Sequence, residues 1–274
     1  MANVLRQDKR ETVIRCLVDG ASIRATERIA GVHRDTILRL LVNVGAGCER
    51  LLDEQMRNLP CRRLQVDEIW GYVGKKQRHL TVEDDPTRTG DTWTFVAIDA
   101  DTKLVPVYRI GKRDYATAVD FLSDLAGRLT NRVQLSSDAL AAYVYASEQA
   151  FGANVDYGQI VKSYEAEAFG PGRYSPPHVV GAVRTPIIGE PAMAHISTSF
   201  IERQNLTMRM NIRRLTRLTN AFSKKIENLQ AAVALHFAHY NFCRVHQTLR
   251  VTPAMQAGLA GHVWSVKEIV EATG

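Results

Sequence analysis

The chain has 274 residues, 45% of them hydrophobic, which is enough to fill the cores of one large domain and a small one. Its four cysteines are widely spaced and form no Cys-x-x-Cys pair, which argues against a disulfide framework and against a zinc knuckle. No run approaches the roughly 18 uncharged apolar residues of a membrane span, and the first residues lack an apolar signal core, so we expect a cytoplasmic protein with no membrane partner.

The formal net charge is +6, and the basic residues are unevenly distributed along the chain. They gather at Lys75–His79 and again between Arg203 and Arg217, where few acids accompany them. Such clusters are typical of surfaces that contact phosphates, so the charge pattern favours a polyanionic partner. The first cluster contributes Lys75 and Lys76 as candidate DNA contacts.

Residues 10–44 have the apolar spacing of a compact helical unit. Ser22 can cap a short helix, Gly31 ends it, and the next helix opens two or three residues later. This order is that of a helix-turn-helix, so we predict a DNA-binding domain at residues 1–47. A three-helix bundle that serves dimerisation is the alternative. The residues expected at the DNA groove are His33, Arg34, Thr36 and Arg39.

Gly45, Gly47 and Pro60 interrupt the region that follows, and we place a linker at residues 48–62. A larger domain is expected at residues 63–250, and a helical tail at residues 251–274. Within the tail, Ser265 and Glu268 have the spacing of a capping box for a final helix.

The larger domain begins with alternating elements of strand and helix character. Three strands are predicted first, then a helix, a strand that ends at Asp138, and another helix. Their ranges are 64–73, 93–99, 104–110, 114–129, 132–137 and 139–150. This order predicts an α/β fold with a mixed sheet flanked by helices, of the ribonuclease-H-like kind.

Residues 165–197 are rich in glycine and proline and are predicted to be a loop insertion, because long loops in compact domains tend to serve function. A long helix is expected to start at Ser197 or Ser199, and its apolar stripe extends as far as Leu215. The next apolar helix spans about residues 226–240.

Three carboxylates stand at positions that this fold could bring together: Asp67 within the first strand, Asp138 at the end of the fourth, and Glu202 near the start of the long helix. An ionised carboxylate in a half-buried strand is costly unless a cation compensates it. Each residue alone also has an ordinary explanation: a lysine partner for Asp67, a helix cap for Asp138, and a solvated surface for Glu202. Asp99 also ends a strand, but choosing it would leave the sheet one antiparallel strand short.

Phosphodiester cleavage benefits from two Mg²⁺ ions, which activate the attacking oxygen and stabilise the leaving one. Such ions prefer hard oxygen ligands, and three carboxylates can hold a pair of them. We therefore predict that Asp67, Asp138 and Glu202 are both catalytic and metal-binding, with Mn²⁺ able to substitute for Mg²⁺.

Helical spacing brings Arg209 and Arg213 to the same side of the helix as Glu202, and Asn205 lies one turn on. Cations beside a carboxylate can hold the phosphates of DNA, whereas a basic solvated helix face is the alternative. The candidate DNA contacts on this helix are Arg203, Asn205, Arg209 and Arg213.

Four segments in this order resemble the DDE transposases of the insertion-sequence-one family, over about residues 20–260. They are Leu64-Gln-Val-Asp67-Glu-Ile-Trp70, Ser137-Asp138-Ala-Leu-Ala-Ala-Tyr143, Ile201-Glu202-Arg-Gln-Asn205-Leu-Thr-Met-Arg209 and Tyr240-Asn-Phe-Cys-Arg-Val-His-Gln-Thr-Leu249. The resemblance implies a ribonuclease-H-like domain that depends on Mg²⁺ and that cleaves and joins DNA at terminal inverted repeats. It also implies that Asp67, Asp138 and Glu202 are the metal-binding triad and that Arg209 is the basic residue associated with it.

The expected partner is double-stranded DNA, both the element ends and the target. Because both ends must be processed together, we expect a homodimer or a larger assembly on DNA. Two other functions stay open: a nuclease that cuts without joining, and a DNA-binding regulator with an inactive catalytic domain. Trp70 and Tyr72 should pack in the core rather than stack on bases, and the segment from Asn241 should pack on the sheet.

Overall fold

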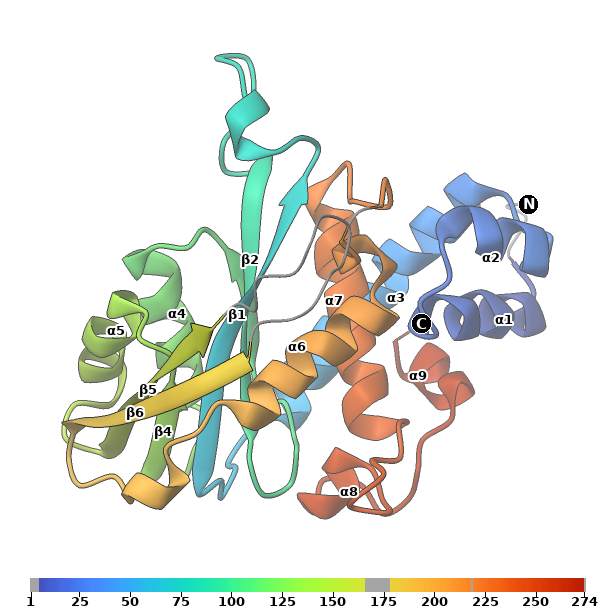
Figure 1. The fold of residues 1–274 in the computed structure, drawn as a ribbon. Coiled ribbons are helices and arrows are strands. Elements are labelled where there is room, and N and C mark those ends of the chain that lie inside the picture. Colours follow the sequence, from blue (N-terminus) through green and yellow to red (C-terminus); the bar gives the residue numbers. More distant parts are fainter. Residues whose placement is uncertain (1–4, 166–177, 218, 274) are drawn as a thin grey trace.

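The computed structural model describes residues 5–165, 178–217 and 219–273 (Figure 1). The helices are α1 (Gln7–Val18), α2 (Ile23–Ala30), α3 (Arg34–Gln55), α4 (Tyr115–Ala126), α5 (Ala141–Phe151), α6 (Ser199–Asn211), α7 (Ile226–Phe242), α8 (Pro253–Gln256) and α9 (Val266–Ala272). The strands are β1 (Arg63–Val73), β2 (Gly90–Asp99), β3 (Tyr108–Gly111), β4 (Val133–Ser137), β5 (Val155–Glu165) and β6 (His178–Ile188). Short 3-10 turns occupy Gln77–His79, Met193–His195 and Arg213–Leu215.

The strands form one six-stranded mixed sheet in the order β3-β2-β1-β4-β5-β6. Strands β1 to β3 pair antiparallel, β1, β4 and β5 pair parallel, and β6 returns antiparallel to β5. The two crossovers that parallel pairing requires are supplied by α4 and α5. This six-stranded sheet flanked by helices is compatible with the predicted ribonuclease-H-like fold.

Helices cover both faces of the sheet. On one face α4 and α5 lie together, and Phe95 of β2 contacts Phe121 of α4 and Tyr143 of α5. On the other face α6 crosses β1 and β2 (Figure 1). Next to α6, α7 reaches β3 through the stacked rings of Tyr108 and Phe237, whose centroids lie 5.0 Å apart. The acids on β1 and β4 therefore lie between two helical layers.

The third strand begins later than predicted, at Tyr108 rather than at residue 104. The reason is a competing partner for the backbone at Val105. The side chain of Asn241 on α7 accepts a hydrogen bond from the Val105 N–H at 3.0 Å and donates one to the Val105 carbonyl at 2.9 Å. Asn241 and Phe242 are fully buried, so the start of the predicted segment packs inside the protein, whereas Arg244 and Val245 after it are exposed.

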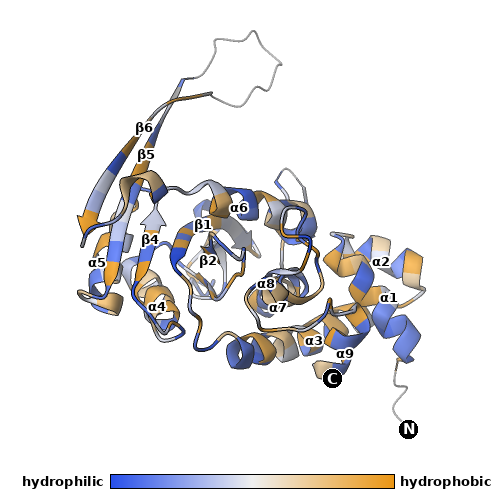
Figure 2. Cartoon of the chain, turned by 90° about the horizontal axis from the view of Figure 1, so that it is seen from below, coloured by the Kyte–Doolittle hydropathy of each residue, from blue (hydrophilic) through white to orange (hydrophobic). Residues whose placement is uncertain are grey.

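The predicted loop insertion at residues 165–197 is wrong in part, because residues 178–188 form β6. Strands β5 and β6 make a hairpin that extends past the body of the protein (Figure 2). The valines of β6 are exposed, at 54% for Val179 and 62% for Val183, and only Ile187 and Ile188 at its end pack against the core, so most of the strand has no buried face that the sequence could indicate. Residues 166–177 of the predicted insertion lie outside the described residues.

The turn between α2 and α3 is built as the sequence indicates. The Ser22 hydroxyl accepts a hydrogen bond from the Ala25 N–H at 3.1 Å. Gly31 ends α2 with a left-handed backbone at φ 64°, a conformation that glycine adopts without strain, and His33 caps α3. The helices and the turn of the predicted unit are thus present, whereas its DNA binding stays a prediction.

The chain does not break at the predicted linker, because α3 continues through residues 47 and 48 to Gln55. The two glycines that suggested a break are sites of close helix packing instead. A Cβ at Gly45 would lie 2.5 Å from Ala231 of α7, and one at Gly47 would lie 2.4 Å from Thr273. Buried side chains of the helices and the sheet form one contiguous core. The division into residues 1–47, 48–62, 63–250 and 251–274 remains a prediction.

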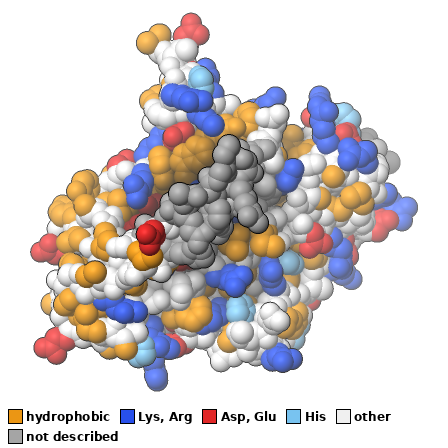
Figure 3. Space-filling model, in the orientation of Figure 1, with side chains coloured by type: hydrophobic (Ala, Val, Ile, Leu, Met, Phe, Trp, Pro, Cys, Tyr) orange, Lys and Arg blue, Asp and Glu red, His pale blue; other side chains and the backbone are white. Residues whose placement is uncertain are grey.

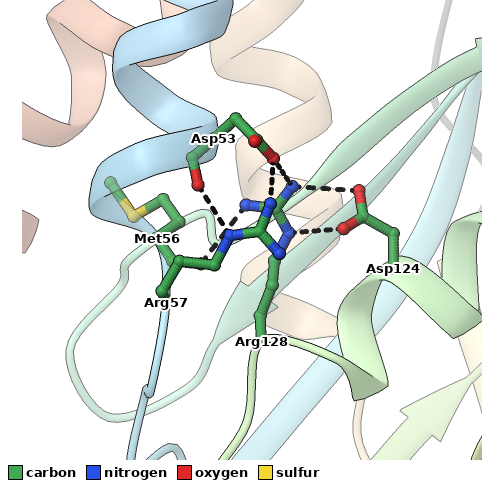
Figure 4. Close-up of polar contacts among 5 residues, drawn as sticks. All are labelled: Asp53, Met56, Arg57, Asp124 and Arg128. Carbon is green, nitrogen blue, oxygen red and sulfur yellow. Dashed lines mark hydrogen bonds and ion pairs between the residues drawn. The ribbon is translucent and has the colours of Figure 1, made fainter.

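Arg128 ties the end of α3 to the sheet layer (Figure 4). Its guanidinium donates to Asp124 of α4 at 2.7 and 3.0 Å, to Asp53 of α3 at 2.8 Å and to the Met56 carbonyl at 3.2 Å. Arg57 also binds Asp53. Because the Arg128 side chain is only 7% exposed and is paired on every side, this network fixes α3 against α4.

The C-terminal segment folds back onto the helical layer, where α9 contacts α1, α3 and α7. Ser265 and Glu268 form the predicted capping box at its start. Among the described residues, none of the helices combines the length and apolar character needed to cross a membrane.

Candidate metal centre

Two of the predicted acids come together because their strands are parallel neighbours. Gln65 of β1 pairs with Ser136 of β4, so two residues further along Asp67 lies beside Asp138. Carboxylate oxygens of Asp67, Glu68 and Asp138 all lie within 4.8 Å of one another. The pairing register therefore builds a cluster of three acids where β4 ends.

The Asp67 carboxylate is held on both sides. One oxygen accepts from the Glu68 N–H at 2.8 Å, and the other accepts from the Asn205 amide of α6 at 2.8 Å. Burial, followed by the nearby charge of Glu68, raises the pKa of Asp67 to about 7, and Asp138 and Glu202 contribute in the same direction. Asp67 has no cationic partner among the described residues, so its charge is left uncompensated by the chain itself.

Glu68 differs from Asp67 because it has charge partners. Its side chain is 4% exposed, accepts from the Arg113 guanidinium at 2.7 Å, and accepts from the Tyr143 hydroxyl at 3.0 Å. Burial and the charge of Asp138 raise the pKa of Glu68, while Arg113 and Tyr143 act against that shift. Glu68 is thus a buried, oriented carboxylate at the border of the cluster.

Asp138 follows directly after β4. One of its carboxylate oxygens accepts from the Leu140 N–H at 3.0 Å, which is the local turn that precedes α5. Asp138 therefore does not cap α5, which begins at Ala141. It orders the turn that leads into this helix, so the alternative role as a helix cap is observed only in part. Among the described residues, only one of the two Asp138 carboxylate oxygens accepts a hydrogen bond, so the other is available to a ligand.

Glu202 lies outside the three-acid cluster in this structure. It stands in the first turn of α6, where it forms an ion pair with Lys162 of β5 and accepts from the Thr198 hydroxyl at 2.7 Å. Its side chain is 45% exposed. The charge of Glu202 contributes to the raised pKa of Asp67, so it lies near the cluster without joining it. Its role as the third metal ligand stays a prediction.

The residues of the cluster fit a hard divalent cation. Every donor is a carboxylate oxygen, the ligand type that Mg²⁺ and Mn²⁺ prefer. In addition, Oδ1 of Asn205 is buried and has no hydrogen-bond partner in the part of the chain that the structure describes. A buried acceptor without a partner is costly, and it lies on the side chain that already touches Asp67.

Asp99, the competing candidate, is occupied by its own turn. Its side chain is buried and accepts from the Thr102 N–H at 3.1 Å and from the Thr102 hydroxyl at 2.6 Å. These bonds hold the tight connection after β2. Asp99 is therefore a structural residue and not part of the acid cluster.

The basic residues predicted near Glu202 are placed differently from one another. Arg203 is exposed on α6, whereas Arg209 is half-buried and donates to the Leu215 carbonyl at 3.1 Å. Arg213 is not on α6, which ends at Asn211, so the helical spacing that related it to Glu202 does not apply. Asn205 points toward the acid cluster, where its amide donates to Asp67.

The other candidate DNA contacts lie at two places on the surface. Lys75 pairs with Asp84 at 2.8 Å within the connection from β1 to β2, and Lys76 lies over the Tyr72 ring. At the start of α3, His33, Arg34 and Arg39 are exposed and Thr36 is half-buried. Figure 3 shows Lys and Arg side chains on both the projecting β1–β2 hairpin and the N-terminal helices.

Trp70 and Tyr72 are half-buried rather than core residues. Their ring centroids lie 5.7 Å apart, and Tyr72 packs on Phe222 at 4.7 Å. The expectation of core packing is therefore wrong in degree: the rings pack on each other at the surface where the β1–β2 hairpin leaves the sheet.

Sequence reasoning missed four residues of this site: Glu68, Arg113, Tyr143 and Lys162. Glu68 is adjacent to Asp67, but side chains of neighbouring strand residues point to opposite faces, so strand periodicity does not indicate a shared site. Arg113 and Tyr143 reach Glu68 from 45 and 75 residues away, and no local pattern indicates such contacts.

Comparison with known proteins adds little to this site. No protein-family model matches the sequence, and no curated protein matches it. Solved structures that match include the Mos1 transposase in a paired-end complex with the left transposon end, at 14% identity and a TM-score of 0.24. The match covers 57% of this chain and 60% of that chain. A similarity at this level does not indicate a function.

Proposed function

We propose that this protein is a metal-dependent DDE transposase that cleaves DNA at the ends of an insertion sequence and joins those ends to new DNA. One observation carries the proposal: Asp67 of β1 and Asp138, directly after the parallel neighbour β4, lie together, and α6 packs on β1 with Asn205 bonded to Asp67. The four sequence segments that resemble insertion-sequence-one transposases include both acids.

In this proposal Asp67 and Asp138 hold divalent cations, Mg²⁺ or Mn²⁺ and two per site, and Glu202 of α6 is the third acid. Such ions supply an activated attacking oxygen and a stabilised leaving oxygen for the phosphodiester. Asn205 orients the Asp67 carboxylate through its 2.8 Å hydrogen bond. Arg113 and Tyr143 hold Glu68 and offset its charge, which leaves the negative charge of the site on Asp67 and Asp138.

The remaining residues of the proposal bind double-stranded DNA. His33, Arg34, Thr36 and Arg39 would read the element end in a groove, as the second helix of a helix-turn-helix does. Arg203, Arg209, Arg213, Lys75 and Lys76 would contact phosphates of the DNA that reaches the acids. Two ends must be processed together, so the active species on DNA is a homodimer or a larger assembly.

The experiment is strand transfer of a labelled element-end duplex, taken from the DNA that flanks the gene, into supercoiled plasmid. It compares Mg²⁺, Mn²⁺ and EDTA for the wild type, Asp67→Asn, Asp138→Asn and Glu202→Gln. Glu148→Gln is the matched control, because Glu148 is exposed on α5 away from the acids.

Joined product that requires both the metal and the three acids would support the proposal. Cleavage without joining would assign a plain nuclease. Duplex binding without cleavage in every metal would assign a DNA-binding regulator. Activity that survives Glu202→Gln but not Asp67→Asn would remove Glu202 from the triad and leave the rest of the proposal intact.

A further inference from the structure

A second site of charge lies away from the acids. A cleft of about 730 Å³ separates the N-terminal helices from the segment that joins α6 to α7. Asp35 is the one acid among the described residues that line it. The cations that line it are Arg24, Arg34, Arg213, Arg214 and Lys224.

The single acid in the described lining pairs with one of these cations, Arg34, and leaves the other four without a carboxylate from the cleft. Asp35 lies 3.5 Å from Arg34 and 3.7 Å from His33, so its charge is already shared. Within residues 5–165, 178–217 and 219–273, no ion pair is recorded for Arg24, Arg213 or Lys224. The cleft therefore carries a surplus of positive charge that the chain does not balance.

Arg214 is the residue least explained by the fold. It donates to the Ser223 hydroxyl at 3.1 Å, and its other terminal nitrogen, Nη2, is buried without a partner among the described residues. Burial alone lowers the pKa of Arg214 to about 10, with no nearby carboxylate acting against it. A buried cation without a counter-charge is costly, and a structural role would ordinarily supply that counter-charge.

The two walls of the cleft are fixed against each other. A Cβ at Gly20, in the turn between α1 and α2, would lie 2.7 Å from the Met210 carbonyl oxygen near the end of α6. Gly45 of α3 also packs closely on α7, since a Cβ there would lie 2.5 Å from Ala231. The N-terminal helices and the helices α6 and α7 are therefore in direct contact beside the cleft, and the cations of both walls face a common space.

We propose that this cleft seats the sugar-phosphate backbone of duplex DNA and that Arg214 contacts a phosphate there. The inference rests on the proposed function and extends it, because it places a stretch of the substrate between the start of α3 and the end of α6. One small anion would need only one or two of the five cations, whereas a polyanion uses cations on both walls. Arg214, absent from the sequence-derived candidates, becomes a binding residue.

The test is affinity for a labelled duplex, measured by fluorescence anisotropy in EDTA over a series of salt concentrations. The variants are Arg214→Gln and the double substitution Arg213→Gln with Lys224→Gln, whose side chains are both exposed. The matched control is Arg50→Gln, which removes one exposed charge from α3 away from the cleft. Thermal melts report whether Arg214→Gln still folds, and the double variant tests the cleft without that risk.

We expect Arg214→Gln to weaken binding by about tenfold, for the element end and for unrelated duplex alike, because a phosphate contact carries no sequence information. The double variant should lower the slope of log affinity against log salt by roughly 2, one unit for each lost contact. Arg50→Gln should leave both quantities unchanged.

Unchanged affinity and slope in both variants, with wild-type binding intact, would overturn the cleft while the DNA-processing function stands. A wild type that binds no duplex would overturn both. A double variant that binds DNA normally but changes from dimer to monomer in analytical ultracentrifugation would assign the cleft to a second copy of the chain, and so would also overturn the proposal.

Discussion

Two clusters of charge in this protein, each centred on a buried side chain, are built in opposite ways. Around Arg128, two cations, Arg128 and Arg57, meet the two carboxylates of Asp53 and Asp124, so the charges balance within the chain. Around Asp67, carboxylates meet each other, and the cation nearest to them, Arg113, is taken by Glu68. The first arrangement holds α3 to α4. The second costs stability unless something outside the chain compensates it, which is the property expected of a binding site.

Asp138→Asn should show this difference most strongly. Loss of a metal ligand is expected to reduce strand transfer by roughly a thousandfold. The folded protein should become more stable, by up to about 1 kcal/mol, because a like-charge contact with Asp67 and Glu68 is removed. Assays of joined product and thermal melts of the same preparation would check both. A variant that loses activity and stability together would contradict the view that these acids repel each other in the metal-free fold.

Arg128→Met should reduce stability, in contrast to Asp138→Asn. It leaves Asp53 and Asp124 without their shared cation, and we expect a loss of about 2 to 3 kcal/mol in the free energy of unfolding. That is less than for a fully buried pair, because the side chains of Asp53 and Asp124 are 55% and 31% exposed. Urea unfolding gives the value, with Arg57→Gln as the matched control on the same Asp53. A control as destabilised as Arg128→Met would mean that Arg128 is not the centre of the network.

His236 gives a third case for the comparison, because it is a buried titratable side chain with no carboxylate among the causes of its pKa shift. Burial, then the charges of His239 and Arg244, lowers its pKa to about 3. A folded pKa below the unfolded value of about 6.5 means that His236 favours the folded state above pH 6.5, and that this stability is lost as pH falls towards 3. At pH 5 the loss should be about 2 kcal/mol. The urea midpoint, measured from pH 7 down to pH 4, should fall less for His236→Gln than for the wild type. Parallel curves for the two proteins would exclude His236 as a source of acid sensitivity.

Asn205→Ala should give the smallest effect, and it separates orientation from ligation. Residues that orient metal ligands typically affect affinity by 10- to 100-fold, and we expect about tenfold weaker Mn²⁺ binding at the lower end of that range. Asn205→Asp restores an oxygen without the amide donor and so tests whether the hydrogen bond to Asp67 matters. Calorimetric titration with Mn²⁺ measures both. Equal affinity in all three proteins would show that Asn205 has no part in the metal site.

Asp67 in β1 and Asp138 after β4 could be predicted as site residues from the sequence, because strand alternation and strand ends are local patterns. The parallel pairing of the two strands then places Asp67 beside Asp138. The position of Glu202 could not be predicted from the sequence, because its contacts with Lys162 and Thr198 depend on how β5 and α6 pack. Gly45 and Gly47 were misread for a related reason. In a sequence, a glycine required for close helix packing looks the same as a glycine that ends a helix. Arg213 was placed on α6 because helical periodicity was extended two residues past the end of that helix.

The continuity of α3 has a consequence for how the proposed enzyme would choose its cut. Its first two turns carry the predicted reading residues, its middle packs on α7 at Gly45, and its last turn is tied to α4 by Arg128. The predicted reading residues therefore stand on a helix that is held at two places against the helices packed on the sheet, so α3 itself would not move to absorb an error in spacing. One base pair inserted between the recognised sequence and the cleavage point shifts the phosphate by about 3.4 Å and turns it by about 35° around the duplex. Such a protein would measure its substrate in base pairs and reject ends of the wrong length, even when every recognised base is present.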